Sequence, residues 1–337
     1  LPFMAVGNYV DLNDPKGPFF ACDTHQILEP NGNIYKSNKL EPGFCSLSML
    51  TAKDASGEMR LRISNDRQYY VRNGYEQMWD LYDQRFLTEA DGWDKFSIWG
   101  MGIASRDITG DGRDEVVLTS MGDQLLRLAN SDGTYKNAPF EIGTYAHKPY
   151  FGDDGRPSTG WHAQFSDINN DGLADLFIAK GNVDQMPSNA IKDPNNLLIQ
   201  QTNGLFQEVG LDAGIASLER GRGAALADFD LDGRIDILVM NRRAPMEIYR
   251  NVTKNTGNWL AIQLVQKGGN INAIGSRITI GKDSQQVTIG GGHAGGQALP
   301  IHFGLGDAKT AIINIEWPDG SLTEHKTNTN QILKIRH

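Results

Sequence analysis

Short apolar runs separated by polar turns recur along most of the chain. Three of them, at residues 116–118, 176–178 and 237–239, each follow a loop that is rich in carboxylates. Runs of this length, bounded by Gly and Asp, are typical of buried β-strands. No long amphipathic helical pattern competes with them. The pattern therefore predicts an all-β fold built from many short strands.

The carboxylate-rich loops share one pattern, with oxygen-bearing side chains at relative positions 1, 3, 5 and 9 and a glycine at position 6. Acidic loop 1 contains Asp107, Thr109, Asp111, Gly112 and Glu115; acidic loop 2 contains Asp167, Asn169, Asp171, Gly172 and Asp175; acidic loop 3 contains Asp228, Asp230, Asp232, Gly233 and Asp236. An eroded fourth copy places Ala52, Asp54, Ser56, Gly57 and Arg60 at the same positions. The four glycines are 55, 60 and 61 residues apart, which indicates an internal repeat.

An Asn-Gly or Asp-Gly pair also falls once in each repeat. The four pairs are Asn31-Gly32, Asn73-Gly74, Asp132-Gly133 and Asn203-Gly204. Such pairs favour two-residue hairpins, because both central positions of the turn need positive φ. Each repeat then contains two hairpins, one turned by the acidic loop and one by this pair. Four antiparallel strands per repeat indicate a β-propeller blade, with the extra length in links such as residues 182–194.

The acidic loops have the composition of a divalent cation site. Three or four carboxylates within nine residues repel one another unless a cation lies between them. Asp and Asn at alternate positions, a carboxylate at position 9 and a glycine at the bend suit Ca²⁺, whereas Mg²⁺ demands stricter octahedral geometry. The backbone carbonyl at position 7, from Arg113, Leu173 or Arg234, completes each expected site. We therefore expect about three structural Ca²⁺ sites; the alternative is that the loops are solvated hairpins.

In the eroded copy, Arg60 stands where the other loops carry Asp or Glu. A guanidinium paired with Asp54 would replace the missing ion there. This hypothesis predicts one bound ion fewer than there are repeats.

The pattern changes after Asn258. Apolar and polar residues alternate with the period of a strand in residues 259–265, 275–280, 286–289, 311–317 and 331–335. No acidic loop lies among them, so we predict a small β-sandwich over residues 256–337, after propeller repeats over residues 1–255. The glycine-rich segment 290–296 lacks the context of a phosphate-binding loop. We interpret it as a backbone crossing that tolerates no side chains, with a functional role for His293 as the alternative.

Composition narrows the class of partner and the compartment. The chain has 337 residues, with 32 Lys and Arg against 41 Asp and Glu, and a net charge of −9. This charge disfavours binding to nucleic acid and to anionic membranes, and no apolar run is long enough to span a bilayer. Cys22 and Cys45 are expected to form a disulfide, with two buried thiols as the alternative. The chain starts at Leu1, so we expect a removed leader or a truncated sequence.

The acidic loops with their following strands resemble the FG-GAP repeats, also called VCBS repeats, of integrin α-subunit propellers and many bacterial secreted proteins. Residues 259–337 resemble the ASPIC/UnbV domain, through segments 273–278, 301–307 and 315–320. This order is that of the family of cartilage acidic protein and its bacterial relatives. The resemblance implies a calcium-bound propeller with a C-terminal β-domain, in an extracellular or periplasmic location. Propellers of this family usually have seven blades, whereas four repeats are recognisable here. Either the remaining blades are too divergent to recognise, or they precede Leu1, or the ring closes in a different way.

Cations and aromatic rings are expected around the propeller axis. In a propeller the strand entering each acidic loop is innermost, so residues at its start and at the exit of the next strand surround the axis. In this chain these positions hold the predicted ligand-binding residues Arg67, Trp161, His162, Lys180, Arg220, Arg222, Arg242 and Arg243. Such a cluster suits a carboxylate, a sulfate or an acidic sugar. The alternative is that these cations form structural salt bridges with blade carboxylates.

Two function classes remain open. The first is a noncatalytic binding or adhesion module for a glycan, an acidic small molecule or an extracellular protein, with calcium as scaffold. The second is a carbohydrate-active enzyme of lyase or dehydratase type, with His162 or His147 as general base and arginines stabilising an enolate. No nucleophile motif, zinc signature or dinucleotide fingerprint supports a sharper assignment. A His162 ring packed and bonded to backbone favours the first class, and one facing a pocket beside an arginine favours the second.

Overall fold

The computed structural model describes residues 3–16, 20–66, 73–145, 158–183, 192–293, 296 and 300–337. Within these ranges every regular element is a strand, apart from two single-turn 3-10 helices at Glu89–Asp91 and Phe140–Ile142. No helix of the described residues has the length and apolar character needed to cross a membrane. The predicted all-β fold class is confirmed.

Among the described residues, five sheets precede the C-terminal domain. The first contains β1 (Met4–Val6), β2 (His25–Asn31) and β3 (Ile34–Leu40). The next four sheets each correspond to one sequence repeat, and we call them blades 1 to 4. Blade 1 contains β4 (Ser46–Lys53), β5 (Met59–Asn65), β6 (Gln77–Asp80) and β7 (Arg85–Phe86); blade 2 contains β8 (Gly100–Arg106), β9 (Glu115–Ser120), β10 (Leu125–Ala129) and β11 (Tyr135–Asn137); blade 3 contains β12 (Gly160–Ser166), β13 (Asp175–Lys180), β14 (Asn196–Gln200) and β15 (Phe206–Glu208); blade 4 contains β16 (Gly221–Ala227), β17 (Asp236–Asn241) and β18 (Glu247–Tyr249).

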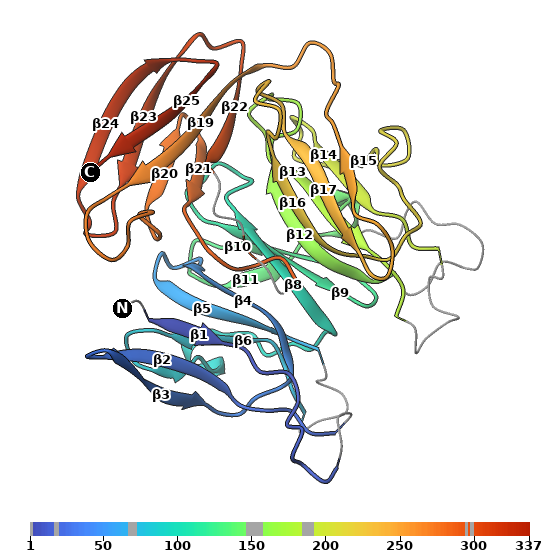
Figure 1. The fold of residues 1–337 in the computed structure, drawn as a ribbon, viewed down its shortest axis with the longest axis vertical. Helices are drawn as coiled ribbons and strands as arrows, with labels where there is room; N and C mark the ends of the chain where they lie inside the picture. Colours follow the sequence, from blue (N-terminus) through green and yellow to red (C-terminus); the bar gives the residue numbers. More distant parts are fainter. Residues whose placement is uncertain are drawn as a thin grey trace.

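The blades are arranged as in a propeller. They follow one another in an arc (Figure 1), and their first strands β4, β8, β12 and β16 are neighbours although they belong to different sheets. Buried apolar side chains fill the space between successive blades. Leu126 of blade 2 and Leu198 of blade 3 belong to one buried cluster, and Phe177 of blade 3 and Val239 of blade 4 belong to another. The strand that enters each acidic loop is therefore innermost, as predicted.

Blade 4 departs from the prediction of four strands per repeat. Within the described residues only β16, β17 and β18 form its sheet. After β18 the chain leaves for the C-terminal domain, and Asn251 bonds back to the carbonyl of Ile168 in the neighbouring blade at 2.8 Å. The prediction is wrong here because the chain crosses to another domain where a fourth strand would begin.

The outer hairpins also differ in detail. At Asp132-Gly133 and Asn203-Gly204 only the glycines have positive φ, 87° and 81°. The N–H of Gly133 donates to the Asn130 carbonyl at 3.1 Å, as in a type I turn that ends in a left-handed glycine. In blade 1 the pair Asn73-Gly74 lies between β5 and β6, and the outer hairpin turns at residues 81–84. Asp80 starts that turn, because its carboxylate accepts the N–H groups of Tyr82 and Asp83 at 2.7 and 2.8 Å.

The N-terminal sheet packs on blade 1. Its residues Ile27 and Leu40 share a buried cluster with Leu61 of β5. Cys22 and Cys45 form the predicted disulfide, which joins the segment before β2 to the segment before β4. This sheet therefore extends the arc by one position without an acidic loop.

The C-terminal domain is the predicted β-sandwich. One sheet has the order β22–β19–β25, with β19 (Asn258–Val265), β22 (Ile301–Gly306) and β25 (Gln331–Arg336). The other has the order β21–β20–β23–β24, with β20 (Arg277–Ile280), β21 (Asp283–Gln286), β23 (Thr310–Glu316) and β24 (Leu322–Asn328). Leu260, Phe303, Ile313 and Trp317 belong to its core. The predicted boundary at residues 255 and 256 falls in the link between β18 and β19.

Three strands of the sandwich differ from the sequence pattern. β22 and β24 were not predicted, because β22 contains two glycines and β24 alternates only exposed with half-buried residues. β21 ends at Gln286, where a strand over residues 286–289 was expected to begin. The hairpin turns at Gly281-Lys282, which pairs Ile280 with Asp283. The second strand therefore begins at Asp283 instead of at Gln286.

The sandwich docks on the side of the blades that carries acidic loops 1 and 2. The Arg106 guanidinium donates to Asp283 at 2.7 Å, and the Arg277 guanidinium donates to Asp114. These two ion pairs cross the interface in opposite directions and all four side chains are buried. Buried pairs of this kind fix an orientation more than they add stability.

A glycine-rich segment of the sandwich reaches the inner strands of the blades. Gly290 forms a bridge with Leu50 of β4, and Gly292 forms one with Ile103 of β8. A Cβ on Gly290 would lie 2.6 Å from the Met49 carbonyl oxygen, and a Cβ on Gly291 would lie 2.7 Å from that of Ile103. We call residues 290–293 the glycine arm. Gly290, Gly291 and Gly292 therefore fit the predicted backbone crossing without room for side chains, while residues 294 and 295 of the predicted segment lie outside the described residues.

Candidate functional site

The three acidic loops share one backbone conformation. Positions 4 and 6 have positive φ in each loop: 73° and 86° at Gly110 and Gly112, 59° and 88° at Asn170 and Gly172, and 61° and 88° at Leu231 and Gly233. The position-1 carboxylate closes the bend by accepting backbone N–H groups. In acidic loop 2, Asp167 accepts those of Asp171 and Gly172 at 3.1 and 2.7 Å. The sequence repeat is therefore a repeat of loop geometry.

The carboxylate at position 9 ties each loop to its blade. Asp175 accepts the N–H groups of Ile168 and Gln200, both at 2.9 Å. The corresponding pairs of bonds go from Ile108 and Ala129 to Glu115, and from Phe229 and Asn251 to Asp236. Position 9 thus connects the start of the loop with the end of the third strand. This structural role was not foreseen from the sequence, where the residue was assigned only as a metal ligand.

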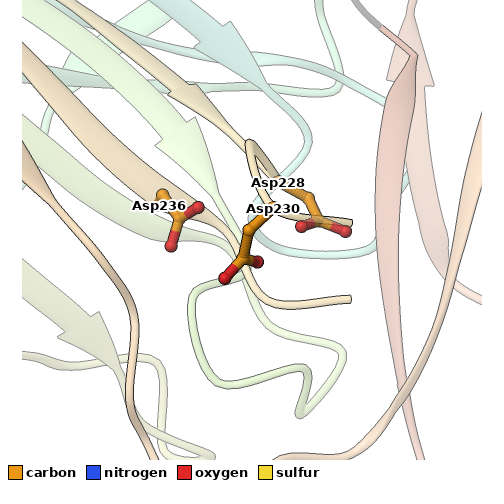
Figure 2. Close-up of side chains that lie close together, drawn as sticks. All are labelled: Asp228, Asp230 and Asp236. Carbon is orange, nitrogen blue, oxygen red and sulfur yellow. The ribbon is translucent and has the colours of Figure 1, made fainter. Parts of the chain in front are cut away.

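Three carboxylates converge in acidic loop 3. One oxygen from each of Asp228, Asp230 and Asp236 lies within 4.8 Å of the other two (Figure 2). A donor set made only of oxygens suits a hard divalent cation. Loops 1 and 2 carry Thr109 and Asn169 at position 3, so each offers a hydroxyl or amide oxygen in place of one carboxylate. The donor set of acidic loop 3 therefore fits Ca²⁺, whereas among the described residues the carboxylates of acidic loops 1 and 2 form no such group of three.

Burial raises the pKa values of several loop carboxylates. Burial, opposed by the N–H of Gly172 and assisted by the charge of Asp171, raises the pKa of Asp167 to about 7. Burial is also the main cause that raises the pKa of Glu115 to about 7. A bound cation favours the charged form of such groups.

Arginines contact the loop carboxylates on the exposed side. Arg113 pairs with Asp111, and Arg234 pairs with Asp232 two residues earlier. Arg250, after β18, lies 2.6 Å from Asp230. Exposed pairs of this kind contribute little to stability. Arg234 and Arg250 partly neutralise loop 3, which has a carboxylate at each of its predicted side-chain ligand positions.

The eroded loop in blade 1 contains the predicted ion pair. Arg60 Nε lies 3.4 Å from Asp54, and Arg60 Nη1 lies 2.7 Å from Asp80 of the next strand. Position 4 of this loop, Ala55, does not have positive φ, so the bend differs from the other three. A guanidinium therefore occupies the charge position that a cation is expected to hold in the other blades.

The sandwich makes direct contact with acidic loop 2. The N–H groups of Gly257 and Gly306 donate to the carbonyls of Asn169 and Asn170 at 3.1 and 2.9 Å. The Asn170 side chain bonds His302 Nε2 at 2.7 Å. A Cβ on Gly304 would lie 1.9 Å from the Asp167 carboxylate, which explains one glycine of the 301–307 motif. The C-terminal motif is therefore a contact surface for an acidic loop.

Among the predicted ligand-binding cations, Lys180 lies in a buried salt bridge, whereas Arg220, Arg222 and Arg242 lie near one another. Lys180 is fully buried and lies 3.0 Å from Asp193, so it forms the structural salt bridge that was the alternative reading. The prediction that Lys180 binds a ligand is wrong, because a buried paired ammonium is not available to a partner. Arg67 and His147 lie outside the described residues.

Arg222 lies over the Trp161 ring near the start of the inner strands. Its guanidinium carbon lies 4.0 Å from the Trp161 ring centroid, a cation–π contact. Its donors bond the carbonyls of Gly221 and Asn182, both at 2.8 Å. Burial, followed by the charges of Arg242 and Arg220, lowers the pKa of Arg222 to about 10. Three guanidinium groups are thus brought together, and no carboxylate of the described chain contacts that of Arg222. Arg243 follows Arg242 on the exposed side.

His162 is packed beneath the glycine arm. Its side chain is 7% exposed, and its Nδ1 accepts the N–H of His293 at 3.3 Å. Burial lowers its pKa to about 4. A Cβ on Gly292 would lie 2.3 Å from the His162 ring. The ring is thus packed and bonded to backbone, as expected for a binding module, but it also lines a cavity between the blades and the sandwich that Arg106 lines too, which is the feature expected for an enzyme.

His293 lies beside Trp161 with the two rings nearly at right angles, their centroids 4.8 Å apart. The glycine arm therefore places a side chain from the C-terminal domain next to the Arg222 and Trp161 pair. This neighbour was not assigned to the ligand site from the sequence, because nothing in the spacing relates residue 293 to residue 161.

Family models match the chain in two places. The model of the FG-GAP-like repeat matches residues 107–178 and 167–239, which contain the three acidic loops. The model of ASPIC and UnbV matches residues 266–337. The matched residues together make up more than half of the chain.

Curated relatives cover part of the chain. Cartilage acidic protein 1 from Homo sapiens is 23% identical over 248 residues, which cover 70% of this chain and 36% of the relative. The protein of the same name from Mus musculus is 23% identical over 181 residues, covering 50% of this chain and 28% of the relative. The chain thus spans about a third of the length of these relatives.

Similar solved structures include an Agrocybe aegerita lectin that recognises non-reducing terminal N-acetylglucosamine, at 16% identity and a TM-score of 0.34 over 91% of this chain and 75% of that one. The V. cholerae biofilm matrix protein Bap1 has 12% identity and a TM-score of 0.35 over 96% of this chain and 50% of that one. Scores this low carry no information on ligand or activity. The sequence matches identify the chain as an FG-GAP-repeat protein with a C-terminal ASPIC and UnbV domain, related to cartilage acidic protein 1.

Proposed function

We propose that this chain is a noncatalytic, calcium-stabilised binding module that recognises an anionic partner through its arginine cluster, outside the cell or in the periplasm. The arginine cluster is defined as Arg220, Arg222, Arg242 and the adjoining Trp161. The partner class is an acidic glycan, an acidic small molecule or an acidic surface of an extracellular protein.

Calcium is supported by the donor set of the acidic loops. The ligands would be the side chains at positions 1, 3, 5 and 9 and the carbonyl at position 7, as expected from the sequence. The convergence of Asp228, Asp230 and Asp236 supports this assignment in acidic loop 3. Ca²⁺ supplies positive charge that relieves the repulsion among these oxygens and joins the two ends of each loop. Its role is structural, because the loops lie between strands and beneath the sandwich.

The observation that carries the binding role is the gathering of guanidinium groups in a chain of net charge −9. The carbonyl bonds of Arg222 and its contact with Trp161 fix the plane of the guanidinium before any ligand arrives. A preorganised guanidinium loses little entropy when it binds a carboxylate or sulfate in a bidentate way. The Cys22–Cys45 disulfide supports an oxidising compartment.

The enzyme alternative has no comparable support. His162 lines the cavity between the blades and the sandwich, but its Nδ1 bonds the backbone of the glycine arm, and Arg106 of the same cavity is paired with Asp283 instead of being available to stabilise an enolate. The binding module is therefore the function we propose.

The test compares binding of sulfated and carboxylated oligosaccharides with binding of neutral dextran by isothermal titration calorimetry. We expect binding of at least one anionic oligosaccharide, and a loss of roughly tenfold or more in affinity for Arg222→Gln, since charge-assisted bonds contribute about 1.5 to 3 kcal/mol. Arg336→Gln is the matched control, because Arg336 is an exposed arginine of the sandwich. Equal affinities for Arg222→Gln and wild type, with both folded, would place the anion elsewhere.

A further inference from the structure

A cavity of about 400 Å³ lies between the inner strands of the blades and the sandwich. Strands β4, β8, β12 and β16 contribute one side, and β19, β21, β22 and β25 of the sandwich contribute the other. The glycine arm borders it through residues 290–292. None of the described arginines of the arginine cluster lines it. It is therefore a separate place from the proposed anion site.

One side of the cavity is apolar. Leu50, Ile103 and Leu226 come from three different blades and are all buried. Ile301 and Ile332 of the sandwich also line the cavity. An apolar surface of this kind suits the C–H face of a ring.

Neutral polar groups line the cavity as well. Ser166 is the last residue of β12, and Gln285 and Thr288 lie in and just after β21. Within the described residues, the hydroxyls of Ser166 and Thr288 and the Gln285 Oε1 have no hydrogen-bond partner. Each of these three atoms keeps some accessible surface. The Gln285 amide nitrogen donates to the His302 carbonyl at 2.8 Å, which fixes the side chain. These three groups accept or donate hydrogen bonds without carrying charge.

The charged groups at the cavity do not offer a free cation. Arg106 is paired with Asp283, and Asp114 is paired with Arg277. Asp228 also lines the cavity, and the Ca²⁺ proposed for acidic loop 3 would balance its charge. The electrostatics therefore favour a neutral ligand.

We propose that this cavity binds one neutral saccharide unit, with its ring on the apolar side and its hydroxyls bonded to Ser166, Gln285 and Thr288. The volume falls within the range of about 300 to 1,000 Å³ that is usual for small-molecule sites, which often form between domains. Because both domains contribute to the cavity, binding requires the docked sandwich. The site is independent of the arginine cluster and of the proposed anion binding.

The experiment titrates the full chain with glucose, galactose, mannose and N-acetylglucosamine, and with glucuronate as a charged relative of glucose. Binding is followed by isothermal titration calorimetry and by saturation-transfer NMR. We expect saturable binding of at least one neutral sugar. Glucuronate is expected to bind roughly tenfold more weakly than glucose or not at all, because no unpaired cation among the described lining residues compensates the lost hydration of its carboxylate.

The variants locate the site. Ser166→Ala and Thr288→Val keep the shape of the wall and remove one hydroxyl each, so each should weaken binding roughly fivefold to tenfold. Thr310→Val is the matched control on the exposed part of β23 and should bind as wild type does. Thr288 is half-buried, so its variant keeps the test valid if Ser166→Ala does not fold.

Absence of saturable binding by every neutral sugar would overturn the proposal. Wild-type affinity in folded Thr288→Val and Ser166→Ala would overturn it too. So would a neutral-sugar affinity that is lost in Arg222→Gln and kept in Ser166→Ala, because the sugar would then lie at the arginine cluster. Failure of the anion titration alone leaves the cavity proposal standing.

Discussion

At the scale of single residues, the acidic loops depend on two left-handed positions that their sequences satisfy unequally. Position 6 is always glycine, but position 4 is Gly110, Asn170 or Leu231. Glycine adopts this conformation freely and asparagine tolerates it, whereas a leucine there is strained. Loop 3 therefore adopts the shared conformation with backbone strain at Leu231, which the other two loops do not have.

Leu231→Gly should stabilise the protein. The side chain is 68% exposed and its φ is 61°, so the substitution relieves backbone strain and removes little packing. We expect a net gain of about 0.5 to 1 kcal/mol in the free energy of unfolding, measured by denaturant titration. The control is Ala55→Gly, at the same loop position without positive φ, which should be destabilising. A loss of stability in Leu231→Gly would show that the leucine has a packing role.

Glu76 is a buried residue whose titration should be visible in stability. Burial raises its pKa to about 8, against hydrogen bonds from Asn65 and Ser64 and the charge of Arg62. The folded pKa lies above the unfolded value of 4.5, so the folded state holds the proton more tightly. The resulting stabilisation is complete below the unfolded value and is lost as the pH rises through about 8.

Glu76→Gln mimics the protonated side chain and should remove this dependence. We expect its melting temperature to exceed that of wild type increasingly between pH 5 and pH 9, as followed by circular dichroism. Glu89→Gln is an exposed control and should follow the wild-type curve. Parallel curves for wild type and Glu76→Gln would mean that Glu76 stays ionised in the folded state.

At the scale of elements, periodic features were predictable and contacts between domains were not. The acidic loops, their following strands and the Arg60–Asp54 pair follow from local spacing, because each depends on a few consecutive residues. The missing fourth strand of blade 4 and the register of β21 depend on where the chain goes next. Lys180 illustrates the same limit, because its partner Asp193 belongs to a link whose path the pattern does not specify.

The glycine arm is the element that joins the sandwich to the propeller axis. Gly292→Ala places a Cβ 2.3 Å from the His162 ring at a φ of 54°. We expect a loss of about 2 kcal/mol or more in unfolding free energy, from overpacking and backbone strain together. Gly268→Ala is the control, because its φ is also positive and no atom lies within 4 Å of its Cβ. Equal losses in the two variants would mean that the arm is not packed on His162.

At the scale of the whole molecule, the acidic loops and the sandwich form one connected structure. Acidic loop 2 bonds Gly257, Gly306 and His302 of the C-terminal part. The ion pairs of Arg106 and Arg277 flank acidic loop 1. Ion binding that orders the loops should therefore also hold the sandwich in place, since the loops supply part of its contact surface.

The most direct test of this account is thermal unfolding with matched determination of bound metal, in millimolar CaCl₂ and after chelation, for wild type and Asp171→Asn/Asp175→Asn. We expect about three Ca²⁺ per wild-type chain and a clear fall in melting temperature on chelation. The variant should bind one ion fewer and have a lower melting temperature than wild type in calcium. A wild-type chain that carries no Ca²⁺ in millimolar calcium and melts at the same temperature after chelation would contradict it.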